Sequence, residues 1–351
     1  MSELSAVPSA AMRLGVLFDP HAPDAGAHAR RLEELGVASL WVPEVWGYDA
    51  LTGLAHVAAQ TSTIGLGTFV VQLGSRSPAL LATSALGLQS LSGGRFTLGV
   101  GVSGPQVMEG WHGVRFHKPV QTTRETIEII RTVSRGERLA HEGEIYPLPL
   151  PGGEGRALRP LVAPAHVPVY VAAMGPANLR LTGEAADGWL GNAFVPEAAD
   201  VVLGPLREGA AAAGRALDAL DLVAPVAVEL TASASETEAA VRRHAAGYAF
   251  TIGAMGSGGR NFYNDAFGRL GHADAVAHVQ ELWRSGDRSA AAAAVPLDLG
   301  RLTNLIGSAA EVAARLELHA SVGVTTVLAK LDGPPEHQRD VVERLVSLLP
   351  G

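Results

Sequence analysis

The chain has 351 residues, of which 47% are hydrophobic and 18% are charged, so it carries enough apolar material for a large core and is not disordered. It contains no cysteine, which excludes disulfides, thiolate nucleophiles and cysteine-bound metal sites. The formal net charge of −8 argues against a general nucleic-acid coat or a basic membrane-binding face.

The amino-terminal residues have neither the basic segment nor the apolar stretch of a signal peptide. No apolar run along the chain reaches the roughly 18 residues that a membrane span requires. We therefore expect residues 1–11 to form a flexible leader and the protein to be soluble and cytoplasmic.

Short runs rich in Val, Leu, Ile and Trp alternate with longer amphipathic stretches, as in parallel sheets whose strands are buried on both faces. Strands are predicted over residues 12–18, 39–44, 63–71, 96–102, 168–174, 187–193, 222–231 and 324–331. Helices are predicted over residues 27–35, 52–61, 78–91, 121–135, 176–186, 196–214, 235–249 and 335–349. Eight such units predict an α/β fold, a (β/α)8 barrel. The alternative is an open doubly wound sheet, but the first strand–helix junction lacks a Gly-rich dinucleotide fingerprint.

Two connections are too long for simple turns between a strand and a helix. They are residues 138–167, which are rich in Pro and Gly, and residues 251–323. We predict that both are insertions into one barrel domain spanning residues 12–351. Long insertions at strand ends often act as lids or binding loops.

In barrels of this kind the active site lies at the carboxyl ends of the strands. The histidines of this chain do not form metal-binding spacings, so we expect no metal. No serine-hydrolase elbow appears, and no pair of carboxylates stands out at one strand end. A wide apolar mouth with backbone donors remains, which suits a large flat organic cofactor that supplies the chemistry itself.

The strand ends carry a set of motifs that together are specific. They are LWVPEVWGYD at 40–49, LGTFV at 66–70, SRSPALLA at 75–82, the Gly-rich stretch 91–113, VAAMGPAN at 171–178 and the segment 255–265. With these motifs the chain, from about Arg13 to Leu348, resembles the bacterial luciferase-like superfamily of flavin- and deazaflavin-dependent oxidoreductases. SGPQ at 103–106 followed by EGWHG at 109–113 is most similar to the branch that uses coenzyme F420, an 8-hydroxy-5-deazaflavin.

The resemblance implies which residues line the cofactor. It places a non-prolyl cis peptide at Phe69–Val70, directly after Thr68, and an acceptor for the ring-edge hydroxyl at Glu44. Val45 stands where sugar-phosphate-oxidising relatives hold a catalytic histidine, which argues against that activity. The other implied cofactor contacts are Ser103, Gly104, Gln106, Ala173, Gly175, Pro176 and Asn178, the last four around a phosphate at a helix start.

Anionic groups of the cofactor tail require local cations in this acidic chain. The candidates are Arg76, Arg156, Arg180 and Arg260, each of which is otherwise a surface charge.

A hydride transfer also requires a group that supplies or removes a proton. His112 is the first candidate because histidine changes protonation near neutral pH, and a loop histidine bonded to backbone is the alternative. Glu109 and Tyr48 are second choices, and Glu109 alternatively caps a helix. The aromatic side chains of Trp46 and Trp111 either wall the substrate pocket or belong to the core.

Three functions fit these features. The first is an F420-dependent reductase, or the reverse dehydrogenase, that acts on a C=C, C=N or C=O group of a small or secondary metabolite. The second is an FMN-dependent luciferase-like monooxygenase, and the third is a non-catalytic flavin-binding protein. We expect a small-molecule substrate, no nucleic-acid or membrane partner, and a homodimer.

Overall fold

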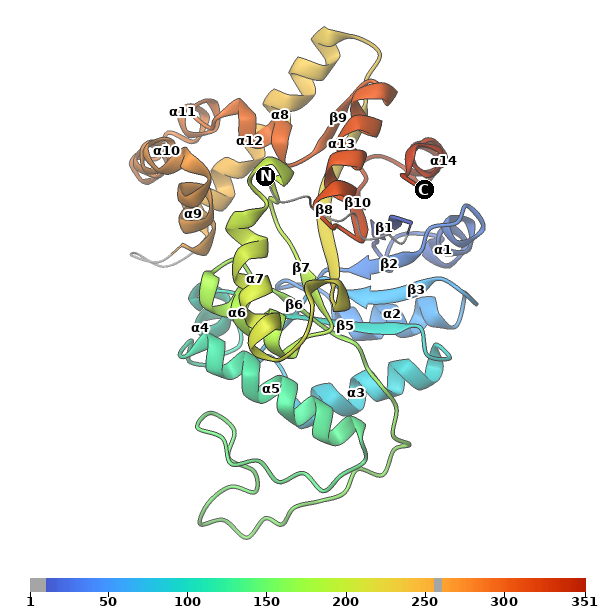
Figure 1. Cartoon of the computed structure of the whole chain (residues 1–351), viewed down its shortest axis with the longest axis vertical. Coiled ribbons are helices and arrows are strands. Elements are labelled where there is room, and N and C mark those ends of the chain that lie inside the picture. The colour runs from blue at the N-terminus through green and yellow to red at the C-terminus, as the bar shows by residue number, and fades with distance from the viewer. Residues whose placement is uncertain (1–10, 256–260) are drawn as a thin grey trace.

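The computed structural model describes residues 11–255 and 261–351 (Figure 1). Its strands are β1 (Arg13–Leu17), β2 (Ser39–Val42), β3 (Gly65–Thr68), β4 (Val71–Gln72), β5 (Phe96–Gly101), β6 (Val169–Ala172), β7 (Gly188–Leu190), β8 (Asp221–Leu230), β9 (Leu305–Gly307) and β10 (Thr326–Lys330). Within this described chain, eight parallel strands close a ring in the order β1, β2, β3, β5, β6, β7, β8 and β10, and β10 pairs back onto β1. This ring confirms the predicted barrel and rules out the open sheet.

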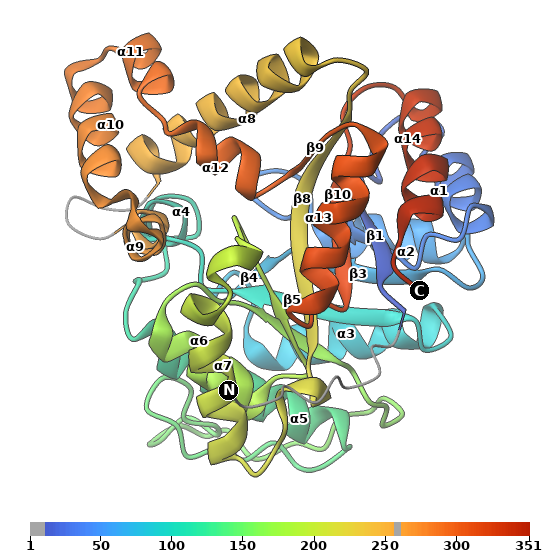
Figure 2. The same ribbon diagram turned by 45° about the horizontal axis from the view of Figure 1, so that its top comes forward.

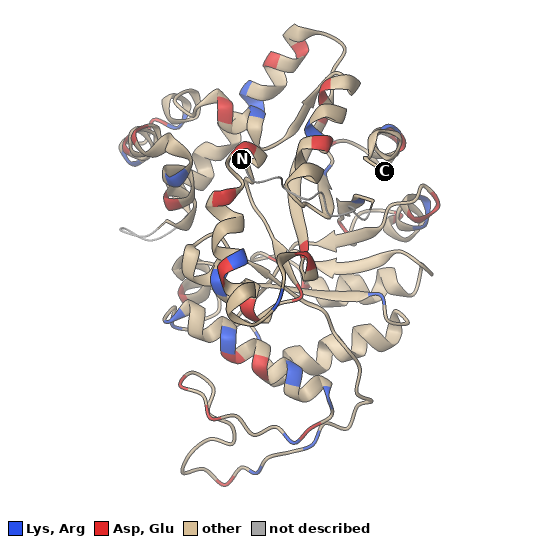
Figure 3. Ribbon diagram, viewed as in Figure 1, with Lys and Arg blue, Asp and Glu red and all other residues tan. Residues whose placement is uncertain are grey.

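The α-helices lie around and above this ring (Figure 2). They are α1 (Ala25–Glu34), α2 (Ala50–Ala58), α3 (Pro78–Leu91), α4 (Pro105–Gly110), α5 (Pro119–Ser134), α6 (Pro176–Ala185), α7 (Asp200–Ala212), α8 (Ala234–Ala254), α9 (Phe262–Phe267), α10 (Ala273–Ser285), α11 (Arg288–Ala293), α12 (Leu297–Leu302), α13 (Ala309–Ser321) and α14 (Pro335–Leu348). Charged residues lie mostly on helices and loops, whereas the ribbons of β2, β3 and β5 carry none (Figure 3). Among the described helices, none has both the length and the apolar character needed to cross a membrane.

Two short strands were not predicted. The predicted strand 63–71 is divided, because β3 ends at Thr68 and the chain bends before it resumes as β4. The second, β9, pairs with residues 228–230 of β8. Since β8 is ten residues long, its end extends beyond its pairing with β10 and needs a partner there.

The floor of the barrel mouth depends on a close contact between β3 and β5. A Cβ atom on Gly99 would lie 1.9 Å from the Thr68 carbonyl oxygen, so only glycine allows this approach. The Thr68 hydroxyl donates to the Gly99 carbonyl at 2.7 Å and accepts from the Gly99 N–H at 2.9 Å. One buried hydroxyl therefore joins the two strands directly below the bend at Phe69.

The two long connections lie at different places. Residues 135–168 run from the end of α5 to the start of β6. Part of this connection folds back along α5, since the N–H groups of residues 144–146 donate to Glu125 and Glu144 pairs with Lys118 at the start of α5. Helices α9–α12 follow β8 and α8, so they rise from the carboxyl-end side. In α13, Val312 and Leu316 belong to the main core, although this helix falls within the segment 251–323. The division into one domain with two insertions stays a prediction.

We predict that Gly183→Ala destabilises the protein by about 1–3 kcal/mol. A Cβ at Gly183 would lie 2.0 Å from the Leu206 carbonyl oxygen, because α6 and α7 pack backbone against backbone. Gly204→Ala on α7 is the matched control, since nothing lies within 4 Å of its added Cβ. Urea unfolding should show a loss only for the first variant, and equal stability of the two would contradict the close packing.

Candidate active site

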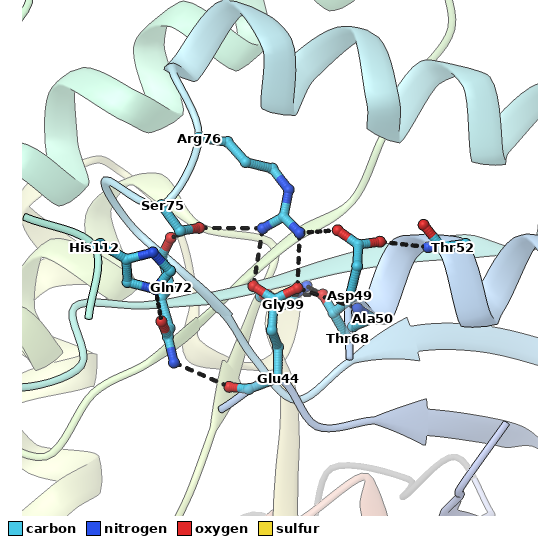
Figure 4. A network of polar contacts seen from close by, with 10 residues as sticks. All are labelled: Glu44, Asp49, Ala50, Thr52, Thr68, Gln72, Ser75, Arg76, Gly99 and His112. Atoms are coloured by element: carbon cyan, nitrogen blue, oxygen red, sulfur yellow. Dashed lines mark hydrogen bonds and ion pairs between the residues drawn. The ribbon is translucent and has the colours of Figure 1, made fainter. Parts of the chain in front are cut away.

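A buried ion pair organises the mouth where β2 ends (Figure 4). The Arg76 guanidinium donates to both carboxylate oxygens of Glu44, each at 2.8 Å, and the two side chains are only 15% and 7% exposed. The Ala50 N–H also donates to Glu44, at 3.1 Å. A carboxylate has roughly four acceptor positions, of which these bonds use three. Glu44 therefore keeps one acceptor position for a ligand.

Arg76 also pairs with Asp49, which caps the start of α2 by accepting from the Thr52 N–H at 2.6 Å. Hydrogen bonds to Glu44 hold the pKa of Arg76 above its ordinary value. Burial by itself would raise the pKa of Asp49, but the hydrogen bonds from Thr52 and Arg76 lower it. Two carboxylates around one guanidinium give this side of the mouth a net negative charge.

A second set of hydrogen bonds fixes His112. The Gln72 side-chain amide donates to the Glu44 backbone carbonyl at 3.2 Å, so its oxygen faces the His112 Nε2 atom at 2.6 Å. An amide oxygen only accepts, so Nε2 carries the hydrogen and Nδ1 is the free atom of a neutral ring. The alternative of a histidine ring bonded to backbone is therefore wrong.

The structure does not bring the other two acid/base candidates to His112. Glu109 is exposed and accepts from the Phe116 N–H at 3.0 Å, which secures the loop after α4. Tyr48 is 73% exposed, and its ring centroid lies 4.1 Å from that of His21. Neither Trp belongs to the core, because Trp46 and Trp111 are both exposed.

The bend after β3 forms the floor of the mouth. The Phe69–Val70 peptide is cis, as the resemblance implied. Both side chains pack on the cluster inside the barrel and remain partly exposed. Thr68 is fully buried with its hydroxyl engaged by Gly99, so it supports this floor and offers no surface to a ligand.

The ends of β5 and β6 lead into helices whose first turns lack a side-chain cap. Ser103 has a positive φ of 57°, and Gly104 precedes α4, with the exposed Gln106 in its first turn. Gly175 precedes the ten-residue helix α6, which begins at Pro176. The free N–H groups of such a turn can bind an anion.

Asn178 on α6 carries a buried Oδ1 atom with no hydrogen-bond partner in residues 11–255 and 261–351. A buried acceptor without a partner is costly, and a ligand hydroxyl would satisfy it. A polyhydroxylated phosphate chain such as that of a flavin or deazaflavin supplies both a hydroxyl and an anion, so these residues fit that group. Ala173 contributes backbone only, since it is buried and its carbonyl accepts from the Trp189 side chain at 2.9 Å.

Two cavities lie at this end of the barrel. One has a volume of about 300 Å³ and is lined by residues that follow β1 and β2, among them Leu17, Asp19, Pro43 and Tyr48. The other is smaller, about 30 Å³, and is lined by Ala173 and residues after β7. The larger is within the range of small-molecule sites. Neither Trp46 nor Trp111 lines either of these two cavities.

Of the candidate arginines within the described residues, Arg76 and Arg180 are already paired with carboxylates. Arg76 is held by two carboxylates, and Arg180 is exposed and pairs with Glu208 at 2.6 Å. Arg156 is exposed and lies in the connection before β6, next to Ala157, whose carbonyl accepts from Arg138 just after α5, so it is placed near the end of α5. Arg260 lies outside the described residues.

Sequence reasoning missed Arg269, whose guanidinium donates to the Met174 carbonyl at 2.8 Å beside α6. Sequence reasoning also missed the link through Gln72, because no spacing in the chain joins residues 44, 72 and 112. Tyr263 of α9, which lies in a segment that carries one of the motifs, contacts the rim, since its hydroxyl accepts from the Asn192 amide at 3.3 Å.

The comparisons with known proteins agree with this fold. A family model described as "Luciferase-like monooxygenase" matches residues 5–326, and the chain belongs to that family. This confirms the resemblance and the enzyme class, an oxidoreductase of the luciferase-like class. The chain is 37% identical over 318 residues to a Mycobacterium tuberculosis protein named "Putative coenzyme F420-dependent oxidoreductase Rv3520c", covering 88% of this chain and 90% of that protein.

Solved structures share the fold. A coenzyme F420-dependent tetrahydromethanopterin reductase from Methanopyrus kandleri superposes with a TM-score of 0.76 at 22% identity, covering 96% of this chain and 97% of that one. An F420-dependent secondary alcohol dehydrogenase, solved with an F420–acetone adduct, superposes with a TM-score of 0.75 at 17% identity, covering 97% of this chain and 100% of that one.

We predict that Arg76→Met destabilises the protein by about 3–5 kcal/mol, because it leaves the buried Glu44 carboxylate unpaired. Arg31→Met is the control: it removes an exposed pair with Glu34 and should cost less than about 1 kcal/mol. Thermal unfolding at several pH values checks both variants.

The pH dependence of this loss of stability has a definite sign. The folded pKa of Asp49 is lowered, so wild-type protein gains stability from this group above about pH 4 and loses it as the pH falls. The free energy of unfolding of Arg76→Met should therefore fall furthest below that of wild type at neutral pH and least in acid. A deficit that grows in acid would contradict the ion pair.

Proposed function

We propose that the protein is a coenzyme F420-dependent reductase of a small-molecule C=C, C=N or C=O group. The observation that carries this proposal is the arrangement of four neighbouring strand ends, β2, β3, β5 and β6, which we call the cofactor arc. The arc combines an acceptor position on Glu44, a floor at Phe69–Val70 and the free helix start at Gly175. These features match a hydroxylated tricyclic ring with a phosphate tail.

When bound, a reduced deazaflavin supplies two hydrogens, one as a hydride from its ring carbon and one as a proton from a ring nitrogen. The chain must hold an acceptor next to that carbon at about 3–3.5 Å and exclude competing water. The cavity of about 300 Å³ beside the arc is the place for that acceptor. Its lining is largely apolar, with Val42, Pro43 and Val45 on one side, which favours an apolar metabolite over a sugar phosphate.

His112 is the acid/base group on the cofactor side in this proposal. Its Nε2–H is held by Gln72, which leaves Nδ1 free to take up a proton. Glu109 and Tyr48 are less suited, since one secures a loop and the other lies largely in solvent. The homodimer stays a prediction.

An FMN-dependent monooxygenase is the second candidate, because the matched family model is described as a luciferase-like monooxygenase. An oxygenase must activate oxygen at the flavin, which a deazaflavin does poorly because ring position 5 is carbon. The relative that matches along 88% of the chain is named for F420 rather than FMN, which favours the reductase.

We predict that purified protein binds F420 at least about tenfold more tightly than FMN. Asn178→Leu should weaken F420 binding by about tenfold, the equivalent of one hydrogen bond. Fluorescence titration of the protein with each cofactor measures both effects. Tighter FMN binding, or oxygen consumption with reduced FMN, would favour the monooxygenase.

We predict that His112→Ala lowers turnover about 100-fold or more while the F420 affinity changes little. Gln72→Leu removes the group that orients the ring and its hydrogen bond to the Glu44 carbonyl but leaves the imidazole in place, so it should have a smaller effect on turnover. Stopped-flow oxidation of reduced F420 checks both variants. Unchanged turnover in His112→Ala would refute its acid/base role.

A further inference from the structure

Lys330 lies at the carboxyl end of β10 and points toward the inside of the barrel. Leu328, two residues earlier, belongs to the cluster that fills the barrel, and side chains two apart on a strand share a face. Lys330 pairs in register with Ala227 of β8. Continuing the Val16–Ala329 register by one residue places Lys330 beside Leu17, which lines the cavity of about 300 Å³.

The ammonium group of Lys330 is half-buried and lacks a counter-ion. Among the described residues no hydrogen bond or ion pair joins it, whereas the exposed Lys118 pairs with Glu144. Burial lowers the pKa of Lys330. The titratable and charged groups on the adjoining elements, none of them bonded to Lys330, are Asp19 and His21 after β1, Glu229 of β8 with its partners Arg243 and His244, and Asp332.

The choice of lysine at this position is itself informative. Residues 118 and 330 are the only lysines among the 27 basic residues of the chain. Arginine binds anions in a bidentate manner but does not release its proton in proteins, whereas a desolvated lysine does. All other basic residues of the chain are arginines, apart from Lys118, yet the inward-facing position at the carboxyl end of β10 is a lysine.

Lys330 also lies opposite the cofactor arc. In the ring of strands, β10 is four positions from β5 in either direction, through β6, β7 and β8 or through β3, β2 and β1. A substrate placed between a cofactor on the arc and the far wall would therefore have Lys330 on its other side.

We propose that Lys330 is the catalytic acid that protonates the substrate, a role that rests on the proposed reductase function. As the acceptor carbon receives the hydride, the electron pair of its double bond moves to the adjoining oxygen, nitrogen or carbon atom. That atom forms a bond to a proton as an N–H bond of the Lys330 ammonium breaks. His112 takes the proton given up on the cofactor side, and water restores the Lys330 ammonium through the open mouth.

The first test measures the amine directly and does not depend on turnover. Reductive methylation with ¹³C-formaldehyde labels only Lys118, Lys330 and the terminal amine, and the variants K118R and K330R assign the signals in NMR spectra. The Lys330 signal should titrate at a lower pH than that of Lys118, because burial lowers the pKa of Lys330. A Lys330 signal that titrates with or above Lys118 would overturn the proposal.

The second test separates proton transfer from fixed charge. Reduced F420 is mixed with cyclohex-2-en-1-one, acetone or a cyclic imine, and its oxidation is followed by absorbance. K330M and K330R should both lower turnover about 100-fold or more, with F420 affinity within about twofold of wild type. K118M is the matched control and should match wild type, since the Lys118 side chain is exposed and pairs with the exposed Glu144.

The outcomes distinguish the two proposals. If K330R keeps wild-type turnover, a fixed positive charge suffices and Lys330 is not the acid. If K330M keeps it as well, the residue takes no part in the reaction. If wild-type protein binds F420 but reduces none of the three acceptors, the proposed reductase function itself fails. K330M removes an unpaired buried charge, so it should fold at least as stably as wild type, which thermal unfolding verifies.

Discussion

The contact between Thr68 and Gly99 is the constraint on which the mouth depends. Because a glycine lets β5 approach the Thr68 carbonyl and one hydroxyl joins both backbone groups, the end of β3 is fixed before the chain bends at Phe69. That bend divides the strand, forms the floor and directs the following residues across the rim. Gln72 then reaches back to Glu44, and the loop continues to Arg76. A different β3–β5 spacing would move every group of the cofactor arc.

The charges around the mouth follow from this frame. On the side of β2, Glu44 and Asp49 surround Arg76 and leave a net negative charge in a poorly solvated place. On the side of β10, Lys330 has no described counter-ion. The two sides of the largely apolar cavity therefore carry charges of opposite sign. This arrangement suits a reaction that moves negative charge from a donor to an acceptor. In the proposed reaction, the polypeptide orients the reactants and moves protons, while the cofactor supplies the hydride.

Much of the fold follows from the sequence because buried parallel strands are short apolar runs that differ clearly from amphipathic helices. Each of the eight barrel strands was predictable, with ends shifted by a few residues. The short strand β9 was not, since its pairing depends on where β8 ends in space. Of the site, the motif-bearing segments were found, and so was the cis peptide at Phe69–Val70. The partners of Arg76, the link through Gln72 and the inward position of Lys330 needed coordinates, because they join residues distant in sequence.

The central claim is that a tricyclic redox cofactor lies over the Phe69–Val70 floor with its phosphate at the start of α6. A crystal structure of the protein with F420 tests this most directly. The account predicts ring density against Phe69 and Val70, and the phosphate within hydrogen-bond distance of the backbone N–H groups after Gly175. Density for the ring elsewhere, with the floor and the α6 start in contact only with solvent, would contradict it.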